Sequence, residues 1–433
     1  MNIEIKNGRL IDPASGLDQV ADLFVANERI VAIGAAPAGF VSEQTLDASG
    51  LVVVPGLVDL AARLREPGFE YKATLESEME AAVAGGVTSL ACPPDTDPPL
   101  DEPGLVEMLK HRARQLHQAN VYPVGALTQQ LQGRRLTEMA ELFDAGCMAF
   151  SQADMPFEDN LALFRALQYA ATFGFPVWLR PRDHGLVAGG VAHDGEVATR
   201  MGLAGIPVIA ETVALSTMLL LVKATGARVH FCRMSSASGL EMIRAAKQQG
   251  LPVSCDVAIN HIHLTDLDIG YFDSHYHMIP PLRSHRDRDA IRAALLDGTI
   301  DAICSDHTPV DDDGKLLPFA ESEPGATGLE LLLPLTLKWA DEAGQPLPAA
   351  LQKITSDAAR ILGIAAGRLD VGAPADLCVF DPDAEWRVEP RQLKSQGKNT
   401  PFAGMQMRGK VHHTLVNGQP VFLAGQTVTQ PAR

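Results

Sequence analysis

The chain has 433 residues, of which 46% are hydrophobic and 21% are charged, a balance typical of a folded protein with a sizeable core. The 53 acidic and 36 basic residues give a formal net charge of −17, which disfavours nonspecific binding of nucleic acid or of an anionic membrane. The first residues, MNIEIKNGRLIDP, carry charges where a secretory signal needs an apolar block. We therefore expect a cytoplasmic protein.

The apolar runs and the cysteines also fit the expectation of a cytoplasmic protein. The run Val213–Val222 is shorter than the roughly 20 residues of a membrane helix and predicts a buried helix. The six cysteines form no CxxC pair and lie mostly in strand-like runs, so we expect buried free thiols rather than disulfides or a zinc finger. They are Cys92, Cys147, Cys232, Cys255, Cys304 and Cys378.

The central part of the chain alternates short β-type runs with helical stretches. Nearly continuous apolar strands that alternate with helices predict a parallel sheet, and eight such units predict a TIM-type (β/α)8 barrel. Helical spacing is clearest over 70–86 and over 235–250, where a serine precedes the apolar positions and a glycine follows them. The predicted strands are 51–61, 86–94, 120–127, 147–152, 176–182, 228–235, 252–259 and 301–309.

The two ends of the chain have a different pattern. Residues 1–50 and 365–433 show strand alternation and tight turns without helices between them. We expect these segments to form one small β-sandwich, with residues 51–364 as the barrel. A segment rich in acidic residues, glycine and proline, 311–328, follows the last barrel strand, and we expect it to be a mobile loop over the barrel mouth.

Chemistry in a βα barrel lies at the C-terminal ends of the strands. In this sequence those ends are rich in arginine and poor in histidine. They carry Ala61, Arg63, Asp95, Gln152, Ala153, Arg180, Arg182, Arg233, Asn260, His261, Asp306 and His307.

Several blocks resemble one known family. They are VPGLVDLAARLREPGFEYKATLE, ACPPDT, HMIPPLRS, SDHTP and KNTPFAGMQMRGKVHHTLVNGQPVF. In this order they are similar to the dihydroorotases of the amidohydrolase superfamily, and the resemblance spans nearly the whole chain. It implies a TIM barrel with a β-sandwich. In the active members it implies one or two zinc ions, over which carbamoyl-aspartate closes to dihydroorotate.

The metal-ligand positions that the resemblance implies are mostly altered. The HxH pair after the first strand is Ala61 and Arg63, and the bridging ligand after the fourth strand falls at Gln152 and Ala153. The histidines implied after the fifth and sixth strands are Arg180 and Arg233, and only Asp306 is retained. Substrate-contacting positions also differ, because Asp95, Ile279 and Val310 stand where the family has Asn, Asn and His, whereas Arg65 is kept.

These replacements have a direct chemical consequence. A guanidinium group has no lone pair for zinc and stays protonated, so three arginines repel a divalent ion. We therefore expect no zinc and no activated water, and hence no catalytic residue. One hypothesis is that the arginines replace the charge of the metal and pair with Asp306 and with Asp183. Another is an anion pocket for phosphate, sulfate or carboxylate that includes Arg65; the vestigial or anion-binding set is Arg63, Arg65, Asp95, Arg180, Arg233 and Asp306.

One pair of histidines is a candidate for metal binding when its spacing is considered alone. His261 and His263 form an HxH whose spacing would put both side chains on one face of an extended segment. The resemblance places a non-ligand histidine there, so we expect hydrogen bonding rather than metal binding. The same expectation applies to His275, His277, His285, His412 and His413.

Three functions follow from these observations. The resemblance implies a non-catalytic companion subunit of aspartate transcarbamoylase in pyrimidine biosynthesis, and we expect it to form a homo-oligomer. The first alternative is an active dihydroorotase or other cyclic amidohydrolase with a rearranged metal site. The second is a sensor that binds an anionic pyrimidine precursor without turning it over.

Overall fold

Eight parallel strands form the centre of the molecule in this computed structural model, which describes residues 1–424. The strand order is β15-β14-β13-β10-β9-β8-β7-β6, and a parallel bridge between Ala62 and His307 joins the ends of the first and last strands. The sheet is therefore a nearly closed barrel, which confirms the predicted TIM-type fold. Its strands are β6 (Leu57–Asp59), β7 (Val87–Cys92), β8 (Asn120–Ala126), β9 (Ala149–Ser151), β10 (Val177–Leu179), β13 (Val229–Phe231), β14 (Val253–Ala258) and β15 (Ala302–Cys304).

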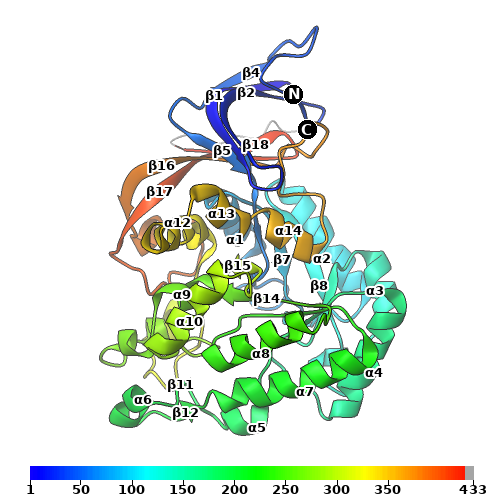
Figure 1. Cartoon of the computed structure of the whole chain (residues 1–433), viewed down its shortest axis with the longest axis vertical. Coiled ribbons are helices and arrows are strands. Elements are labelled where there is room, and N and C mark those ends of the chain that lie inside the picture. Colours follow the sequence, from blue (N-terminus) through cyan, green and yellow to red (C-terminus); the bar gives the residue numbers. More distant parts are fainter. Residues whose placement is uncertain (425–433) are drawn as a thin grey trace.

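Helices pack around the outside of the barrel (Figure 1). The predicted serine cap is confirmed at α8, where Ser236 accepts from the Gly239 amide, whereas the helix expected over 70–86 begins only after Thr74, which caps α1 by accepting from the Ser77 amide. The helices are α1 (Leu75–Ala84), α2 (Pro103–Leu116), α3 (Met139–Ala145), α4 (Asn160–Phe173), α5 (His184–Val187), α6 (Glu196–Met201), α7 (Ile209–Thr225), α8 (Ala237–Gln248), α9 (Ile259–His263), α10 (His285–Leu296), α11 (Asp312–Leu316), α12 (Leu332–Ala343), α13 (Leu347–Gln352) and α14 (Ser356–Leu362).

Two apolar layers hold the barrel together. Alternate strand residues such as Val58, Val124 and Trp178 form one buried cluster, and their neighbours such as Leu57 and Val177 join a larger cluster with the helices. This alternation is what a closed sheet requires, with one set of side chains filling the interior and the other packing outward. The barrel core therefore does not depend on the residues at the mouth.

Both ends of the chain meet in a second sheet at one end of the barrel (Figure 1). Its order is β18-β17-β16-β5-β1-β2-β3, with β4 paired to β1, and it encloses its own apolar cluster. The predicted union of the two termini is confirmed for the described residues. The strands are β1 (Ile3–Asp12), β2 (Leu17–Ala26), β3 (Arg29–Ile33), β4 (Gln44–Asp47), β5 (Val52–Pro55), β16 (Leu377–Arg387), β17 (Gln406–Val416) and β18 (Gln419–Leu423); a two-residue pair, β11 (Ala192–His193) and β12 (Gly205–Ile206), lies outside both sheets. Residues 425–433 of the predicted segment 365–433 lie outside the described residues.

The boundary predicted at residue 50 falls too early. The run 51–61 is two strands, since β5 pairs with β1 and β16 in the terminal sheet whereas β6 begins the barrel. Gly56 lies between them, where a Cβ atom would collide with the side chain of Thr88. The chain can pass from one sheet to the other here only with a residue that lacks a side chain.

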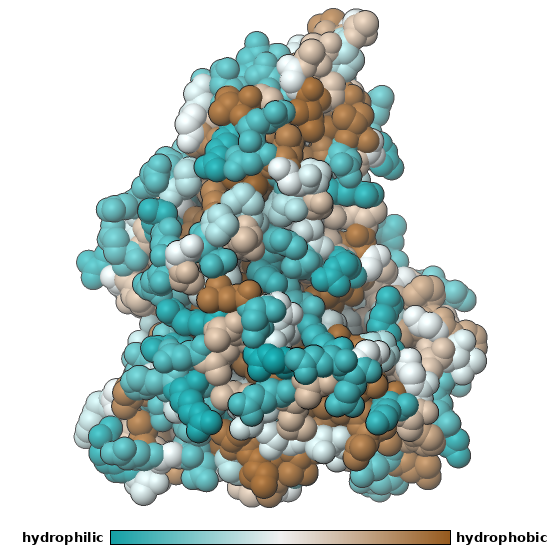
Figure 2. Space-filling model, in the orientation of Figure 1, coloured by the Kyte–Doolittle hydropathy of each residue, from teal (hydrophilic) through white to brown (hydrophobic). Residues whose placement is uncertain are grey.

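The helix predicted at Val213–Val222 exists as part of α7, but it is only partly buried. Val213 is 39% exposed and Leu220 is 66% exposed, and both lie on one helical face with Ile209, which is 52% exposed. Figure 2 shows hydrophobic residues gathered along the lower edge of the molecule, over α5 and α7. The prediction was wrong on burial because an apolar helix can cover the barrel with one face and still present apolar groups on the other.

The expectations for cysteines and for membrane helices can also be compared with the structure. All six cysteines are free, five of them are buried, and Cys232 is partly exposed. Within residues 1–424, no helix has the length and apolar content needed to cross a membrane.

Candidate functional site

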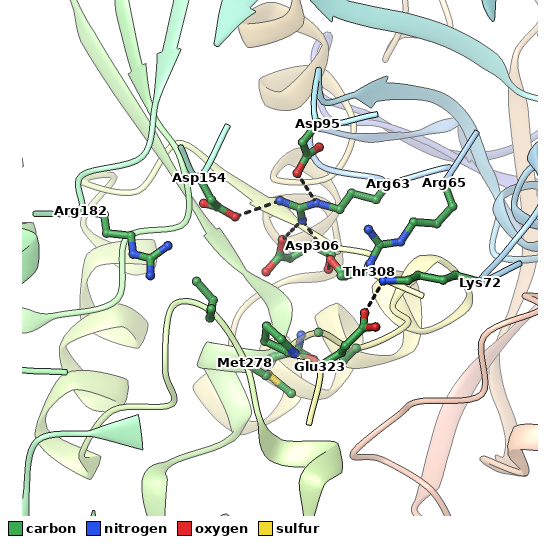
Figure 3. Close-up of a pocket in the computed structure, with 15 residues that line it drawn as sticks. Arg63, Arg65, Lys72, Asp95, Asp154, Arg182, Met278, Asp306, Thr308 and Glu323 are labelled. Atoms are coloured by element: carbon green, nitrogen blue, oxygen red, sulfur yellow. Dashed lines mark hydrogen bonds and ion pairs between the residues drawn. The ribbon is translucent and has the colours of Figure 1, made fainter. Parts of the chain in front are cut away.

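Three arginines and three aspartates meet at the C-terminal end of the barrel, and Figure 3 shows one of the arginines, Arg63, together with Asp95, Asp154 and Asp306. Parallel strands end at the same edge of a sheet, so residues that follow different strands converge there. We name this group the ion-pair cluster. It consists of Arg63 after β6, Asp95 after β7, Asp154 after β9, Arg180 after β10, Arg233 after β13 and Asp306 after β15.

Asp154 is the centre of the ion-pair cluster. Its carboxylate accepts from Arg180 Nη1 at 2.6 Å, from Arg233 Nη2 at 2.8 Å and from Arg63 Nη2 at 3.0 Å. Asp306 accepts from Arg233 Nη1 at 3.0 Å and lies 3.4 Å from Arg63 Nη1. Asp95 accepts from Arg63 Nε at 2.8 Å. Each carboxylate therefore binds at least one guanidinium group, and Arg63 and Arg233 bridge the aspartates.

The predicted pairing of Asp306 is confirmed for two of the three arginines. It is wrong for Arg180, whose ion pair is with Asp154. It is also wrong for Asp183, whose side chain instead accepts from the Leu186 amide and caps α5. The sequence reasoning missed Asp154, because it considered only Gln152 and Ala153 at the end of the fourth strand. The aspartate in SQAD, next to these residues, was the signal that could have found it.

The two uncharged residues where the resemblance implies a bridging ligand, Gln152 and Ala153, do not enter the cluster. Gln152 is buried, accepts from the Thr128 hydroxyl at 2.9 Å and donates to the Leu131 carbonyl at 2.8 Å. Ala153 has a φ of 51°, as unusual as the φ of 55° at Arg233 and 49° at Asp306. Left-handed backbone at non-glycine residues costs free energy and concentrates at functional sites. The mouth thus has the backbone conformation that is typical of a functional site.

The charges in the cluster are mutually stabilised. Burial alone disfavours ionisation of Asp154, but the charges of Arg180, Arg233 and Arg63 outweigh burial and hold the pKa of this carboxyl well below its usual range. Burial lowers the pKa of Arg180 to about 10 and that of Arg65 to about 10. Both guanidinium groups therefore remain charged at neutral pH.

The residues at the mouth do not fit a zinc ion. Ala61 and Ala153 have no side-chain atom that can bind a metal ion. Arg63, Arg180 and Arg233 direct their guanidinium nitrogens at Asp154 or Asp306. Zinc needs three or four neutral imidazole, thiolate or carboxylate ligands. Here a divalent cation would have to displace protein cations from Asp154 and Asp306, which the buried ion pairs oppose.

A second group of potential ligands lies just below the cluster. Ligand atoms of His230, Cys232 and Asp256 lie within 4.8 Å of one another. Both ring nitrogens of His230 are engaged, with Ser254 Oγ at 2.8 Å and with Asp256 Oδ2 at 3.0 Å. Burial raises the pKa of the Cys232 thiol well above its usual value, so the thiol is protonated in the metal-free protein. Asp256 also accepts from the Arg233 amide, so this network positions an arginine of the cluster.

The HxH pair is not a metal site in this geometry. His261 and His263 lie in the helix α9 and not in an extended segment, so that prediction was wrong. His261 Nε2 lies 3.2 Å from the carbonyls of Pro280 and Pro281, and His263 Nε2 lies 2.9 Å from the Leu335 carbonyl. Burial lowers the pKa of both to about 4, so they are neutral hydrogen-bonding groups, as expected.

Two of the other histidines, His277 and His275, have hydrogen bonds of the same kind, whereas His412 and His413 make a ring contact with each other. His277 stacks on Phe319 and its Nδ1 lies 3.0 Å from Ser322 Oγ. His275 pairs with Asp273, and His413 lies edge-on to His412 in β17. His285 begins α10.

A cavity of about 230 Å³ opens beside the ion-pair cluster. Its wall includes Arg65, whose Nε donates to the Pro309 carbonyl at 2.8 Å, and Lys72, which pairs with Glu323. Ile279, at one of the altered substrate-contacting positions, also lines it, whereas Val310 is buried and is not among the lining residues.

The loop 311–328 closes one side of this cavity through Glu323, Pro324 and Gly325. Buried Lys315 holds it in place, with Nζ donating to the carbonyls of Glu323 at 2.6 Å, Ser274 at 3.0 Å and His277 at 3.4 Å. Its predicted place at the mouth is confirmed. Its mobility stays a prediction, and the lysine anchor is a feature that the sequence reasoning did not foresee.

Comparison with known proteins connects this site to a family. The family model described as Dihydro-orotase-like matches residues 50–238, and the model described as Amidohydrolase family matches residues 207–421. A dihydroorotase-like protein of Pseudomonas aeruginosa is 49% identical over 96% of this chain and 99% of its own length. A protein of Syntrophotalea carbinolica named dihydroorotase is 40% identical over 97% of this chain and 98% of its own.

Solved structures support the same assignment. An L-hydantoinase (dihydropyrimidinase) from Arthrobacter aurescens superposes with a TM-score of 0.88 at 26% identity, covering 99% of this chain and 97% of the other. The fold and the mouth thus define an amidohydrolase-type barrel whose mouth carries arginine–aspartate ion pairs. The chain belongs to the dihydroorotase-like proteins of the amidohydrolase family.

Proposed function

We propose that the protein is a non-catalytic dihydroorotase homologue that serves as an assembly subunit for aspartate transcarbamoylase. The observation that carries the proposal is the ion-pair cluster, in which Arg63, Arg180 and Arg233 stand at ligand positions and neutralise Asp154 and Asp306. Without a metal ion there is no bound water of lowered pKa and no Lewis acid for a ring carbonyl. A barrel with this mouth has lost the groups that cyclic-amide chemistry requires in its family.

The barrel itself tolerates that loss. Its interior is filled by apolar residues from alternate strand positions, and the charges of the ion-pair cluster are paired with one another. A scaffold that keeps a rigid core, a second sheet and an intact outer surface can hold other chains in place without chemistry of its own. This separation between core and mouth supports an assembly role.

The surface of α7 supports self-association. Ile209, Val213 and Leu220 form an exposed apolar stripe on one face of this helix, at spacings that recur in helix–helix contacts. Two copies of one stripe can pair about a two-fold axis, because an isologous contact uses the same surface on both chains. We propose a second copy of this chain as the occupant of this stripe.

One alternative is an active amidohydrolase with a rearranged metal site. The observation that favours it is the set of relatives named dihydroorotase, at about 40% identity over nearly the full length. Protein purified without chelator and then incubated with zinc distinguishes the two functions. Stoichiometric zinc together with hydrolysis of dihydroorotate would establish the alternative and overturn the non-catalytic proposal.

A second alternative is a sensor of an anionic pyrimidine precursor. The observation that favours it is the cavity beside the cluster, whose wall keeps Arg65. Calorimetry with carbamoyl-aspartate and with dihydroorotate tests this function. Micromolar binding without turnover would support it.

The assembly role has its own experiment. The chain is tagged and produced together with the aspartate transcarbamoylase catalytic chain of the same cell, and the purified material is weighed by light scattering after size exclusion. We expect both chains in one particle of defined mass. If the two proteins elute separately at micromolar concentrations, the assembly role is wrong.

A further inference from the structure

An apolar surface lies on the two loops that follow β14 and β15. Five large apolar side chains are exposed there, and among them Tyr271 is 93% exposed and Leu316 is 81% exposed. None of the five lines the mouth cavity. We name them the outer patch: Leu267, Tyr271, Phe272, Leu316 and Leu317.

The two loops that carry the outer patch are fastened to each other. The Ser274 hydroxyl donates to the Lys315 carbonyl, and Lys315 Nζ donates to the Ser274 carbonyl at 3.0 Å. Phe272 lies two residues before Ser274, and Leu316 directly follows Lys315. The exposed side chains of the two loops therefore belong to one surface.

The backbone of this surface has a fixed and unusual conformation. Ile269 and Phe319, one from each loop, share a small buried apolar cluster. Phe272 has a φ of 60°, which is rare for a bulky residue and costs free energy. Its ring lies edge-on to that of Tyr271, with the centroids 5.6 Å apart. A segment that exposes two aromatic rings in this way is stabilised when a second surface covers them.

The size of the outer patch is that of a binding surface. Tyr271 alone, at 93% exposure, presents on the order of 200 Å² to water. Single exposed apolar residues are normal, whereas contiguous apolar patches of several hundred Å² mark the places where another molecule binds. Tyrosine is also one of the residue types that contribute most to the free energy of protein–protein binding.

The charges around the outer patch select the kind of partner. The only lysine or arginine in segments 266–276 and 311–322 is Lys315, which is buried. An acidic rim repels a second copy of itself, nucleic acid and an anionic membrane, and it attracts a protein surface with basic residues around an apolar centre. The exposed charged residues of the two segments are all acidic: Asp268, Asp273, Asp312, Asp313 and Glu321.

We propose that the outer patch binds the catalytic chain of the proposed assembly, through a surface of that chain with apolar residues at its centre and lysine or arginine at its edge. This inference rests on the proposed function, to which it adds the contact surface and the chemistry of the partner. It assigns different occupants to two surfaces, because the apolar stripe of α7 binds a second copy of this chain whereas the outer patch binds the partner.

The test uses the full chain and, as the probe, the purified aspartate transcarbamoylase catalytic chain of the same cell. Calorimetry measures the dissociation constant of their complex. Tyr271→Ser combined with Leu316→Ser is expected to weaken binding at least tenfold, because the pair removes an aromatic anchor and the most exposed leucine of the patch. Val20→Ser combined with Val41→Ser, at two exposed valines of the first 50 residues, is the matched control and should leave binding unchanged.

A second pair of variants tests the acidic rim. Asp312→Lys combined with Glu321→Lys should weaken binding at least tenfold at low salt, and the remaining affinity should depend less on salt than that of the wild type. Glu43→Lys combined with Asp383→Lys changes the net charge equally, at exposed residues outside the two loops, and should leave binding unchanged. Equal weakening by both pairs would show an effect of net charge alone and would refute the rim.

The outcomes separate this inference from the assembly role. If the wild type binds the catalytic chain and the folded outer-patch variants bind it equally well, the outer patch is not the contact and the assembly role stands. If the wild type does not bind at micromolar concentrations, both are wrong. If Tyr271→Ser combined with Leu316→Ser lowers the mass of the chain alone in light scattering, the patch binds a second copy and the inference is wrong.

Discussion

Replacing Asp154 with asparagine tests the ion-pair cluster most directly. The substitution keeps the size of the side chain and removes the one carboxylate that three guanidinium groups share, at 2.6, 2.8 and 3.0 Å. Arg63 and Arg233 would keep Asp306 as a partner, but Arg180 would lose its only carboxylate. Removing one partner of a buried ion pair costs about 3 to 5 kcal/mol, and we expect Asp154→Asn to lose about that much of the free energy of unfolding.

The loss should depend on pH in a defined direction. The pKa of Asp154 in the folded protein lies well below its usual range, whereas in the unfolded chain it is about 3.9. A depressed carboxyl pKa stabilises the fold above the unfolded pKa, and this contribution disappears as the pH falls toward the folded pKa. The difference between wild type and Asp154→Asn should therefore be full above about pH 5 and shrink progressively in more acidic solution.

Urea unfolding followed by circular dichroism at several pH values measures both quantities. Asp183→Asn is the matched control, because Asp183 caps α5 and asparagine caps nearly as well, so its stability should change by no more than about 0.5 kcal/mol. Adding Arg180→Met to Asp154→Asn should restore part of the loss by removing the unpaired cation. If Asp154→Asn proves as stable as the wild type at pH 7, the ion-pair cluster does not stabilise the fold by pairing buried charges.

Four further outcomes are expected. Lys315→Met should expose the loop 311–328 to limited proteolysis, because three carbonyls lose their shared donor, and proteolysis no faster than in wild type would contradict this. Burial raises the pKa of Asp376 to about 6, so the protonated carboxyl stabilises the fold below about pH 4, and this stabilisation is lost as the pH rises through 6. Asp376→Asn should make the free energy of unfolding depend less on pH between about 4 and 6, and an unchanged dependence would contradict this. Leu220→Glu on α7 should reduce the mass measured by light scattering, whereas Leu316→Glu, at an 81% exposed leucine of α11, should not; equal masses would exclude the α7 contact. Zinc added to the wild-type chain and then dialysed should leave well below one equivalent by mass spectrometry, and a full equivalent would show that the cluster opens to metal.

Periodicity was sufficient to predict the barrel. All eight predicted runs contain a strand, because buried parallel strands are apolar on both faces and need no partner information to be recognised. The division at Pro55-Gly56 was not predictable in this way. Both halves of the run 51–61 are apolar, and only pairing with β1 and β16 shows that the first half belongs to the terminal sheet.

The site was predictable residue by residue but not as a network. Motif positions indicated that Arg63, Arg180 and Arg233 would lie together near Asp306. They did not indicate Asp154, which lies one residue beyond the position considered, in a strand end whose backbone turns through a positive φ at Ala153. A single left-handed residue changes the direction of the next side chain, and that geometry cannot be read from residue order.

The sequence by itself determined the fold class and the family resemblance, and it indicated arginines where the resemblance implies metal ligands, because these depend on residue type and spacing. Only the tertiary structure decided which carboxylate each arginine binds and that α9 is helical at His261. Ion pairs and unsatisfied groups depend on distances of a few ångströms between residues far apart in the chain. Those distances are set by the packing of the whole barrel.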